Sequence, residues 1–279
     1  MRNPRVADTI AVAAASFALL SIAGSGFAQA PRQQAWSILQ SGVANIATER
    51  RVAAVTVLAM IQGDPKAVTM AEQALQDPDP QVRKAAAVTL GTLKAKSAIP
   101  KLHNALNDKD GDVVMAAAKS LVEIGSEYGY GVYYALVTGE RKSGEGLIGS
   151  QEQQMQQIMH NPKQMADMAF EQGIGYVPFG GIGWGAFQAV HKNEEKEVLV
   201  KANAVRTLAK DPDPRSAKAI VNAAGDPQWL VRAASYDALA RRGDPSLLPD
   251  VAKGLTDQQY VAQLTAAAAV AQLSTVTKK

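Results

Sequence analysis

The sequence predicts an all-α protein, a right-handed α-solenoid of about six helical hairpins with an insert in the fourth. The prediction rests on one repeated pattern. A segment with apolar residues at helical spacing recurs along the chain. Its last apolar residue is Leu58, Leu90, Leu121, Leu208, Leu239 and, less clearly, Val270. The successive spacings are 32, 31, 87, 31 and 31 residues. A period of this size is typical of stacked helical hairpins, and the single long spacing indicates an insert.

Asp-Pro pairs indicate where the helices begin. The carboxylate of Asp accepts hydrogen bonds from free N–H groups at a helix start, and the fixed φ of Pro suits the first helical position. We expect Asp79-Pro80 and Asp226-Pro227 to open the second helix of a hairpin. The pairs expected to open a first helix are Asp64-Pro65, Asp213-Pro214 and Asp244-Pro245.

The second helix of each hairpin has one apolar side. In the clearest copy of the repeat, residues 77–91, apolar residues recur at helical spacing and continue just beyond it, and the fifth hairpin has a matching set. These positions are Val82, Ala86, Leu90 and Leu93 in the second hairpin, and Val231, Ser235 and Leu239 in the fifth. The many Ala residues between them allow neighbouring helices to approach closely. Each hairpin can therefore bury its apolar side only against the next.

The pattern Asp-x-x-Val-Arg-x-x-Ala-Ala-x-x-Leu-Gly, seen best at residues 79–91 and 228–240, resembles the HEAT repeat of the short type known as PBS-lyase HEAT-like. In that family the signature Arg pairs with an acidic loop residue and forms a ladder along the stack. The resemblance assigns Arg83 and Arg232 to a structural ladder, with Lys201 as a partial substitute, and Val114 interrupts it. We expect an acidic residue such as Asp110 or Asp112 to pair with Arg83.

The hairpins are expected to follow one another in sequence order. Their helices are predicted at 35–44 and 48–61 in the first, from Asp64 to Gly91 in the second, and up to Ile124 in the third. The fourth has Tyr128 to Val137 as its first helix, and its second resumes near Lys192. The predicted divisions are 1–30 as a signal peptide, 31–124 as hairpins one to three, 125–210 as hairpin four with an insert at about 139–191, and 211–279 as hairpins five and six with a C-terminal cap.

The N-terminal segment is typical of an export signal. Arg2 and Arg5 precede a mostly apolar stretch from Ile10 to Ile22, and Ala28-Gln29-Ala30 is a small-x-small cleavage pattern. An uncleaved membrane anchor is the alternative, although the apolar stretch is short for a span. We therefore expect an exported protein, periplasmic or secreted.

N-terminal sequencing of the exported protein is expected to begin at Pro31, because cleavage should follow Ala30. A mature protein that still begins at Met1 in the envelope fraction would contradict the cleaved signal.

Composition excludes several classes of function. The formal net charge is +3, and no run of Lys and Arg is interleaved with aromatic residues, so we expect no nucleic-acid binding. The chain contains no Cys, which excludes disulfides, thiolate metal sites and Cys nucleophiles.

The insert departs most from the repeat pattern. Residues 125–185 contain 13 of the 22 Gly, and residues 173–190 form an uncharged run. Its aromatic side chains are the candidate interaction residues, Tyr176, Phe179, Trp184 and Phe187. Either these residues fold back over an apolar part of the solenoid, or they contact a membrane surface or a partner.

The sequence contains no recognisable catalytic, metal-binding or cofactor-binding motif. Deoxyhypusine hydroxylases are HEAT-repeat enzymes that hold two irons with His-Glu pairs, whereas His103, His160 and His191 are followed here by Asn, Asn and Lys. The Gly-rich stretch 139–146 lacks the Gly-Lys-Ser/Thr ending of a phosphate-binding loop. We therefore predict no catalytic residue, metal ligand or cofactor.

These observations together favour an exported, non-enzymatic HEAT-repeat scaffold. It would bind a protein partner of unknown identity through the solenoid surface and the insert. Two alternatives stay open, namely a lyase-like or oxidoreductase-like HEAT enzyme or maturation factor, and a structural protein associated with a membrane surface.

Overall fold

A computed structural model describes residues 30–138 and 193–275. Every regular element in these ranges is helical, which confirms the predicted all-α solenoid. The predicted signal peptide, the insert and its residues Tyr176, Phe179, Trp184 and Phe187 lie outside the described residues. Among the helices that are described, none has the length and apolar character needed to cross a membrane.

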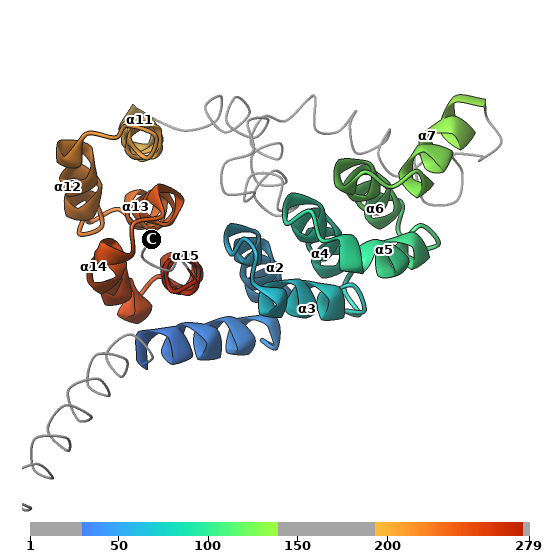
Figure 1. Ribbon diagram of the computed structural model, residues 1–279, viewed down its shortest axis with the longest axis horizontal. Coiled ribbons are helices and arrows are strands. Elements are labelled where there is room, and N and C mark those ends of the chain that lie inside the picture. The colour runs from blue at the N-terminus through green and yellow to red at the C-terminus, as the bar shows by residue number, and fades with distance from the viewer. Residues whose placement is uncertain (1–29, 139–192, 276–279) are drawn as a thin grey trace, which may run out of the picture.

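The helices form two layers (Figure 1). The second helices of the hairpins make the inner layer, α2 (Thr48–Val57), α4 (Pro80–Thr92), α6 (Gly111–Ile124), α11 (Asn193–Leu208), α13 (Trp229–Arg242) and α15 (Tyr260–Leu273). The first helices make the outer layer, a helix over residues 30–43, α3 (Pro65–Ala74), α5 (Ile99–Ala105), α7 (Tyr128–Thr138), α12 (Pro214–Ala223) and α14 (Leu248–Ala252). Short 3₁₀ turns, η1 (Leu58–Met60), η2 (Lys96–Ala98), η3 (Pro245–Leu247) and η4 (Lys253–Thr256), adjoin these helices.

Three of the predicted Asp-Pro pairs begin α-helices as expected. Asp64, Asp79 and Asp213 are the N-caps of α3, α4 and α12, and each carboxylate accepts a hydrogen bond from the N–H two residues later. Asp244 caps the turn η3. Asp226 differs, because α13 begins at Trp229 and its N-cap is Gln228.

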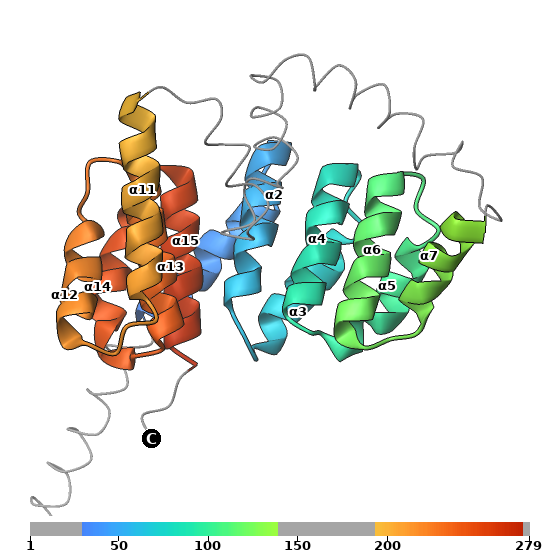
Figure 2. The ribbon, with the colours of Figure 1, turned by 90° about the horizontal axis from the view of Figure 1, so that it is seen from above.

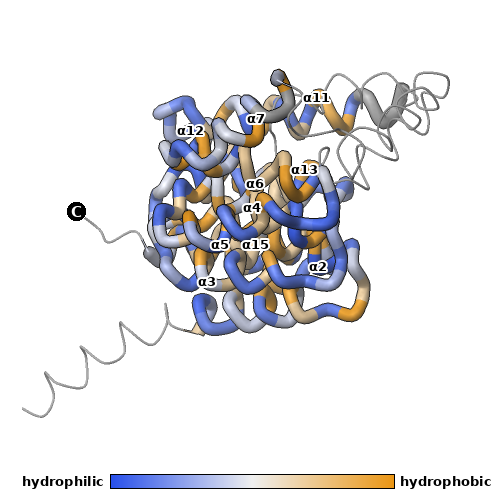
Figure 3. The backbone as a smooth tube through the Cα atoms, turned by 90° about the vertical axis from the view of Figure 1, so that its right-hand side faces the viewer, coloured by the Kyte–Doolittle hydropathy of each residue, from blue (hydrophilic) through white to orange (hydrophobic). Residues whose placement is uncertain are grey.

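The core lies between the two layers. Leu58, Leu90, Leu121, Leu239 and Val270 are fully buried, which confirms most of the repeating positions found in the sequence. Inner-layer helices also approach closely. A Cβ atom added at Gly91 of α4 would lie 2.6 Å from Ser120 Oγ on α6, so Gly at this position permits the contact. Figure 3, which looks onto the α7 end, shows apolar residues recurring along the helices.

The first and the sixth hairpins meet in the middle of the array. The last inner helix, α15, packs against α2, so the sixth hairpin stacks on the first. The N–H of Gln62 donates to Oε1 of Gln272 at 2.7 Å, and the Arg50 guanidinium lies 4.7 Å from the centre of the Tyr260 ring. We call this contact the junction.

The spatial order of the hairpins therefore differs from their order in the sequence. Along the inner layer the helices follow the order α11, α13, α15, α2, α4 and α6, with α7 beyond α6. The helices predicted to form the fourth hairpin, α7 and α11, thus lie at opposite ends of the array (Figures 1 and 2). The sequence could not predict this, because any hairpin of a repeat array presents nearly the same apolar sides to any neighbour.

Candidate functional site

The predicted ladder connects consecutive hairpins. Nε and Nη2 of Arg83 each donate to a carboxylate oxygen of Asp108 at 2.7 Å. Nη1 donates to the carbonyls of Asp77 and Pro78 at 2.9 and 3.0 Å. The partner is therefore Asp108, and the expectation of Asp110 or Asp112 is wrong. Asp110 instead caps α6, and Asp112 accepts a hydrogen bond from Lys84 at 2.8 Å.

The same arrangement recurs at other steps of the array. Arg232 makes a two-pronged contact to Asp257 at 2.7 Å, and Lys201 pairs with Asp226. Asp226 occupies the repeat position of Asp77, two residues before the N-cap, which explains why it does not cap α13. Arg51, which the sequence reasoning missed, makes a two-pronged contact to Asp77 at 2.8 and 2.9 Å. Its position seven residues before Leu58, matching Arg83 before Leu90, could have identified it.

The ladder pairs stabilise the charged forms of their members. Burial alone would raise the pKa of Asp108, but hydrogen bonds from Arg83 and from the backbone outweigh it and the pKa is lowered. The pKa of Asp257 is lowered in the same way, by Arg232. These ion pairs connect neighbouring hairpins, and their charged groups are already hydrogen-bonded within the protein.

Replacing Arg83 with Ala is expected to lower the free energy of unfolding at neutral pH by about 0.5–2 kcal/mol. This value lies between the contribution of an exposed ion pair and that of a partly buried one. Because the folded pKa of Asp108 is below its unfolded value, the stabilisation is present above the unfolded pKa and is lost as pH falls through the folded pKa. The loss measured by urea denaturation should therefore shrink in acid. Arg215→Ala, whose side chain is 91% exposed, is the matched control and should change little. Equal stability of the Arg83 variant and the parent would contradict the ladder.

A second set of charged side chains lies on the inner layer and centres on a buried aspartate. Asp237 of α13 is only 1% exposed, and both of its oxygens lie 2.8–2.9 Å from Nε of Arg241 on the same helix. Nε of Arg206, on the neighbouring helix α11, lies 3.7 Å from Oδ2 of Asp237. We call Arg206, Asp237 and Arg241 the ion cluster.

The electrostatics of the ion cluster are opposite to those of the ladder. Burial lowers the pKa of Arg206 to about 10, and the attraction of Asp237 only partly compensates. Burial raises the pKa of Asp237 despite its two arginine neighbours. Burial thus disfavours the charged forms of both Arg206 and Asp237.

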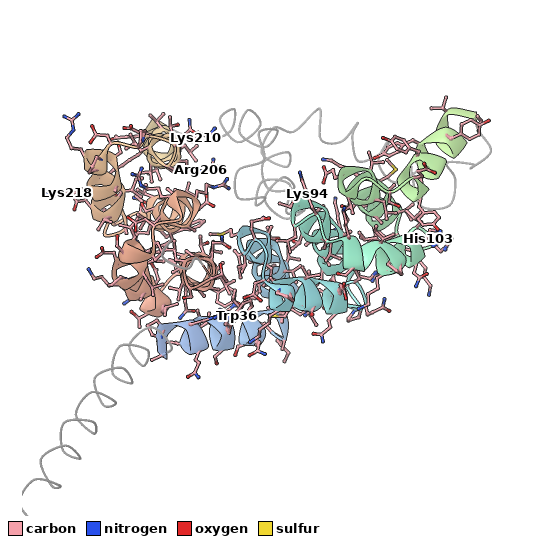
Figure 4. The ribbon with its side chains drawn as sticks, in the orientation of Figure 1. Trp36, Lys94, His103, Arg206, Lys210 and Lys218 are labelled. Atoms are coloured by element: carbon pink, nitrogen blue, oxygen red, sulfur yellow. The ribbon has the colours of Figure 1, made fainter. Side chains whose placement is uncertain are left out.

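One member of the ion cluster, Arg206, lies toward the space between the two arms of the array (Figure 4). In Figure 4, Arg206 lies on the side of its arm that faces the other arm, and Lys94, after α4, lies on the enclosed side of the opposite arm. Lys210 follows Arg206 by one helical turn on the same chain segment. Lys218 of α12 instead lies on the outer side. Arg206 and Lys94 therefore place positive charges on the enclosed sides of the two arms.

The described residues bring no metal ligands together. Residues 30–138 and 193–275 contain no group of three or more His, Cys, Asp or Glu that could hold a metal ion. His103 is exposed and its ring lies 4.4 Å from that of Tyr128, centre to centre. His160 and His191 lie outside the described residues.

Comparison with known proteins identifies the repeats. A family model described as HEAT repeats matches residues 70–129 and 186–271, which together make up more than half of the chain. No curated protein matches. Among solved structures, human deoxyhypusine hydroxylase in complex with glycerol aligns over 88% of this chain and 97% of its own, with 16% sequence identity and a TM-score of 0.32.

The comparison corrects one prediction from the sequence. We expected a non-enzymatic scaffold, whereas one of the solved structures that this chain matches is that of an enzyme. The exclusion of enzymatic activity is therefore wrong as an inference from the repeats, because similar repeats occur in an enzyme. The matched segments, the two helical layers and the arginine ladder agree on the family, and the chain belongs to the HEAT-repeat proteins.

Proposed function

We propose that this chain binds a small anionic ligand, carrying a phosphate or carboxylate group, on the enclosed face beside α11 and α13. The observation that supports the proposal is the ion cluster, in which Arg206 and Arg241 share one buried carboxylate. Two guanidinium groups exceed one carboxylate by one positive charge, and guanidinium is well suited to planar contacts with carboxylate or phosphate oxygens.

The site suits the enzyme or maturation-factor class among the alternatives drawn from the sequence. A ligand anion would lower the electrostatic cost of the partly buried Arg206 guanidinium, so ligand binding and stability should be linked. The ladder arginines are less suitable, because Arg83 and Arg232 each use three nitrogens for protein oxygens. Export, predicted from residues 1–30, stays part of the proposal and is tested by the N-terminal sequence.

Binding is tested by thermal denaturation of the full chain with pyrophosphate or citrate, at an ionic strength held constant with sodium chloride. We expect the anion to raise the melting temperature of the parent, and the rise to be lost in Arg206→Gln and reduced in Arg241→Gln. Loss of one guanidinium contact should weaken binding about tenfold, since a charge-assisted hydrogen bond contributes about 1.5–3 kcal/mol.

Lys218→Gln is the matched control, because it removes one positive charge from the outer side of the same arm. The rise in melting temperature should survive in this variant. An equal loss in Lys218→Gln, or no rise in the parent with either anion, would contradict the site and indicate general charge screening.

A further inference from the structure

The helices at the two ends of the array, α7 and α11, correspond to the first and second helix of a single hairpin. In the complete hairpins a first helix packs across its own second helix, as α3 does on α4 and α12 on α13. Each second helix inside the array also packs on the second helices of both neighbours, as α4 does on α2 and α6. A helix at either end of the array lacks one of these neighbouring helices.

At one end, α7 has the position of a first helix. It packs against α6, and Gly129 allows the close approach, since an added Cβ would lie 2.4 Å from the carbonyl oxygen of Ala118. The second helix that it contacts belongs to the preceding hairpin, whereas its own second helix, α11, lies at the opposite end of the array (Figure 1). The α7 side chains Tyr130, Tyr134 and Val137 are among the exposed large hydrophobic residues, and Tyr134 is 63% exposed.

At the other end, α11 has the position of a second helix. It packs on α13 and α12, and its opposite side carries Val200, which is 61% exposed, and exposed Ala204. The sequence pattern places both residues on the apolar side of a hairpin. Their exposure has a direct cause, because the first helix of that hairpin lies at the far end of the molecule (Figure 2).

The repeat register shows that the two halves match. Leu121 of α6 and Leu208 of α11 occupy the same position in the repeat, so α7 followed by α11 has the order of helices found in every other hairpin. The α11 helix of a second copy could therefore pack at the α7 end of the first copy. In that position it would continue the inner layer beyond α6. The new contact of α11 with α7 would repeat the one that α4 makes with α3.

We propose that α7 of one copy and α11 of a second copy form the missing hairpin, so that copies assemble head to tail. The contact joins two different surfaces, and each copy therefore keeps one free end of each kind. Such a heterologous contact produces open chains, or rings where the rotation closes.

The test uses Tyr134→Glu, which blocks the α7 end, and Val200→Glu, which blocks the α11 end. Both residues are exposed, so neither substitution should alter the circular dichroism spectrum or melting temperature; Tyr134→Ser and Val200→Ser provide milder versions. In sedimentation velocity with the full chain, the parent should form larger species as concentration rises. Each variant alone should be monomeric at the concentrations where the parent associates, since a charge buried at the contact should weaken it tenfold or more.

Mixing the two variants gives the decisive result. The Val200→Glu copy keeps a functional α7 end and the Tyr134→Glu copy keeps a functional α11 end, so the mixture should form dimers and nothing larger. Ile46→Glu, at an apolar residue 99% exposed in the loop before α2, is the control and should associate as the parent does.

Three results would overturn the proposal. A parent that stays monomeric at every concentration would mean that the ends are covered within the chain. Association abolished by Tyr134→Glu and unaffected by Val200→Glu would indicate a symmetric α7 contact instead. Loss of association in Ile46→Glu would indicate nonspecific hydrophobic contact.

Discussion

Replacing Leu264 with Asp is expected to divide the array into two arms that unfold separately. Leu264 lies on α15 and is fully buried, and its Cδ2 would lie 3.0 Å from a Cβ added at Gly42, in the helix over residues 30–43. A carboxylate there would have to lose its hydration at the junction. The cost should be about 4 kcal/mol or more, the range of an unpaired charge in a core.

The position of the junction in the array makes the result distinctive. If the hairpins stacked in sequence order, α15 would be the last helix and Leu264→Asp would loosen only the C-terminal hairpin. With α15 against α2, the same substitution lies at the centre of the stack and separates the arm containing α4 and α6 from the arm containing α11 and α13.

Calorimetry should therefore show one transition in the parent and two in the variant. Hydrogen exchange should rise at α2 as well as at α15. Gln258→Asp adds the same charge at an exposed residue before α15 and should leave a single transition. Increased exchange confined to residues 245–273 would contradict the junction.

Removal of residues 139–194 is expected to make the chain an obligate oligomer that no longer releases a monomer on dilution. The deletion reduces the spacing from Leu121 to Leu208 from 87 to 31 residues, the spacing of the other hairpins. It would force α7 and α11 of one chain into a single hairpin. Because these helices lie at opposite ends of the array, α15 of that chain would then reach α2 only in another copy.

Light scattering after size exclusion should find no monomer of the shortened chain at concentrations where the parent releases it. The matched control replaces the same residues with a Gly/Ser linker of equal length, which keeps the tether and should preserve the parent's monomer. A shortened chain that remains a monomer with one cooperative transition would instead support stacking in sequence order.

Local features of the fold were predictable from the sequence because a few adjacent residues determine them. Asp79 caps α4 and Arg83 joins the ladder as the signature implies. The partner of Arg83 was misassigned because three aspartates, Asp108, Asp110 and Asp112, follow at two-residue spacing, and the geometry of the loop decides which one faces Arg83. Sequence alone does not give that geometry.

The order of the hairpins and the ion cluster were not predicted, for different reasons. The junction depends on which apolar sides meet, and the repeat makes those sides alike. The ion cluster did leave a signal, because Arg206 and Asp237 occupy the same repeat position, two residues before Leu208 and Leu239 in consecutive hairpins. Opposite charges at one repeat position of neighbouring second helices are the pattern that would have indicated it.

The stacking of the sixth hairpin on the first is tested most directly by crosslinking across the junction. The chain contains no Cys, so Gln62→Cys and Gln272→Cys would introduce the only thiols, at positions 210 residues apart whose native groups are joined by a hydrogen bond. A short bismaleimide should join them within one chain, and dilution should not reduce the yield. Absence of the crosslink, or crosslinks that form only between chains, would contradict the account.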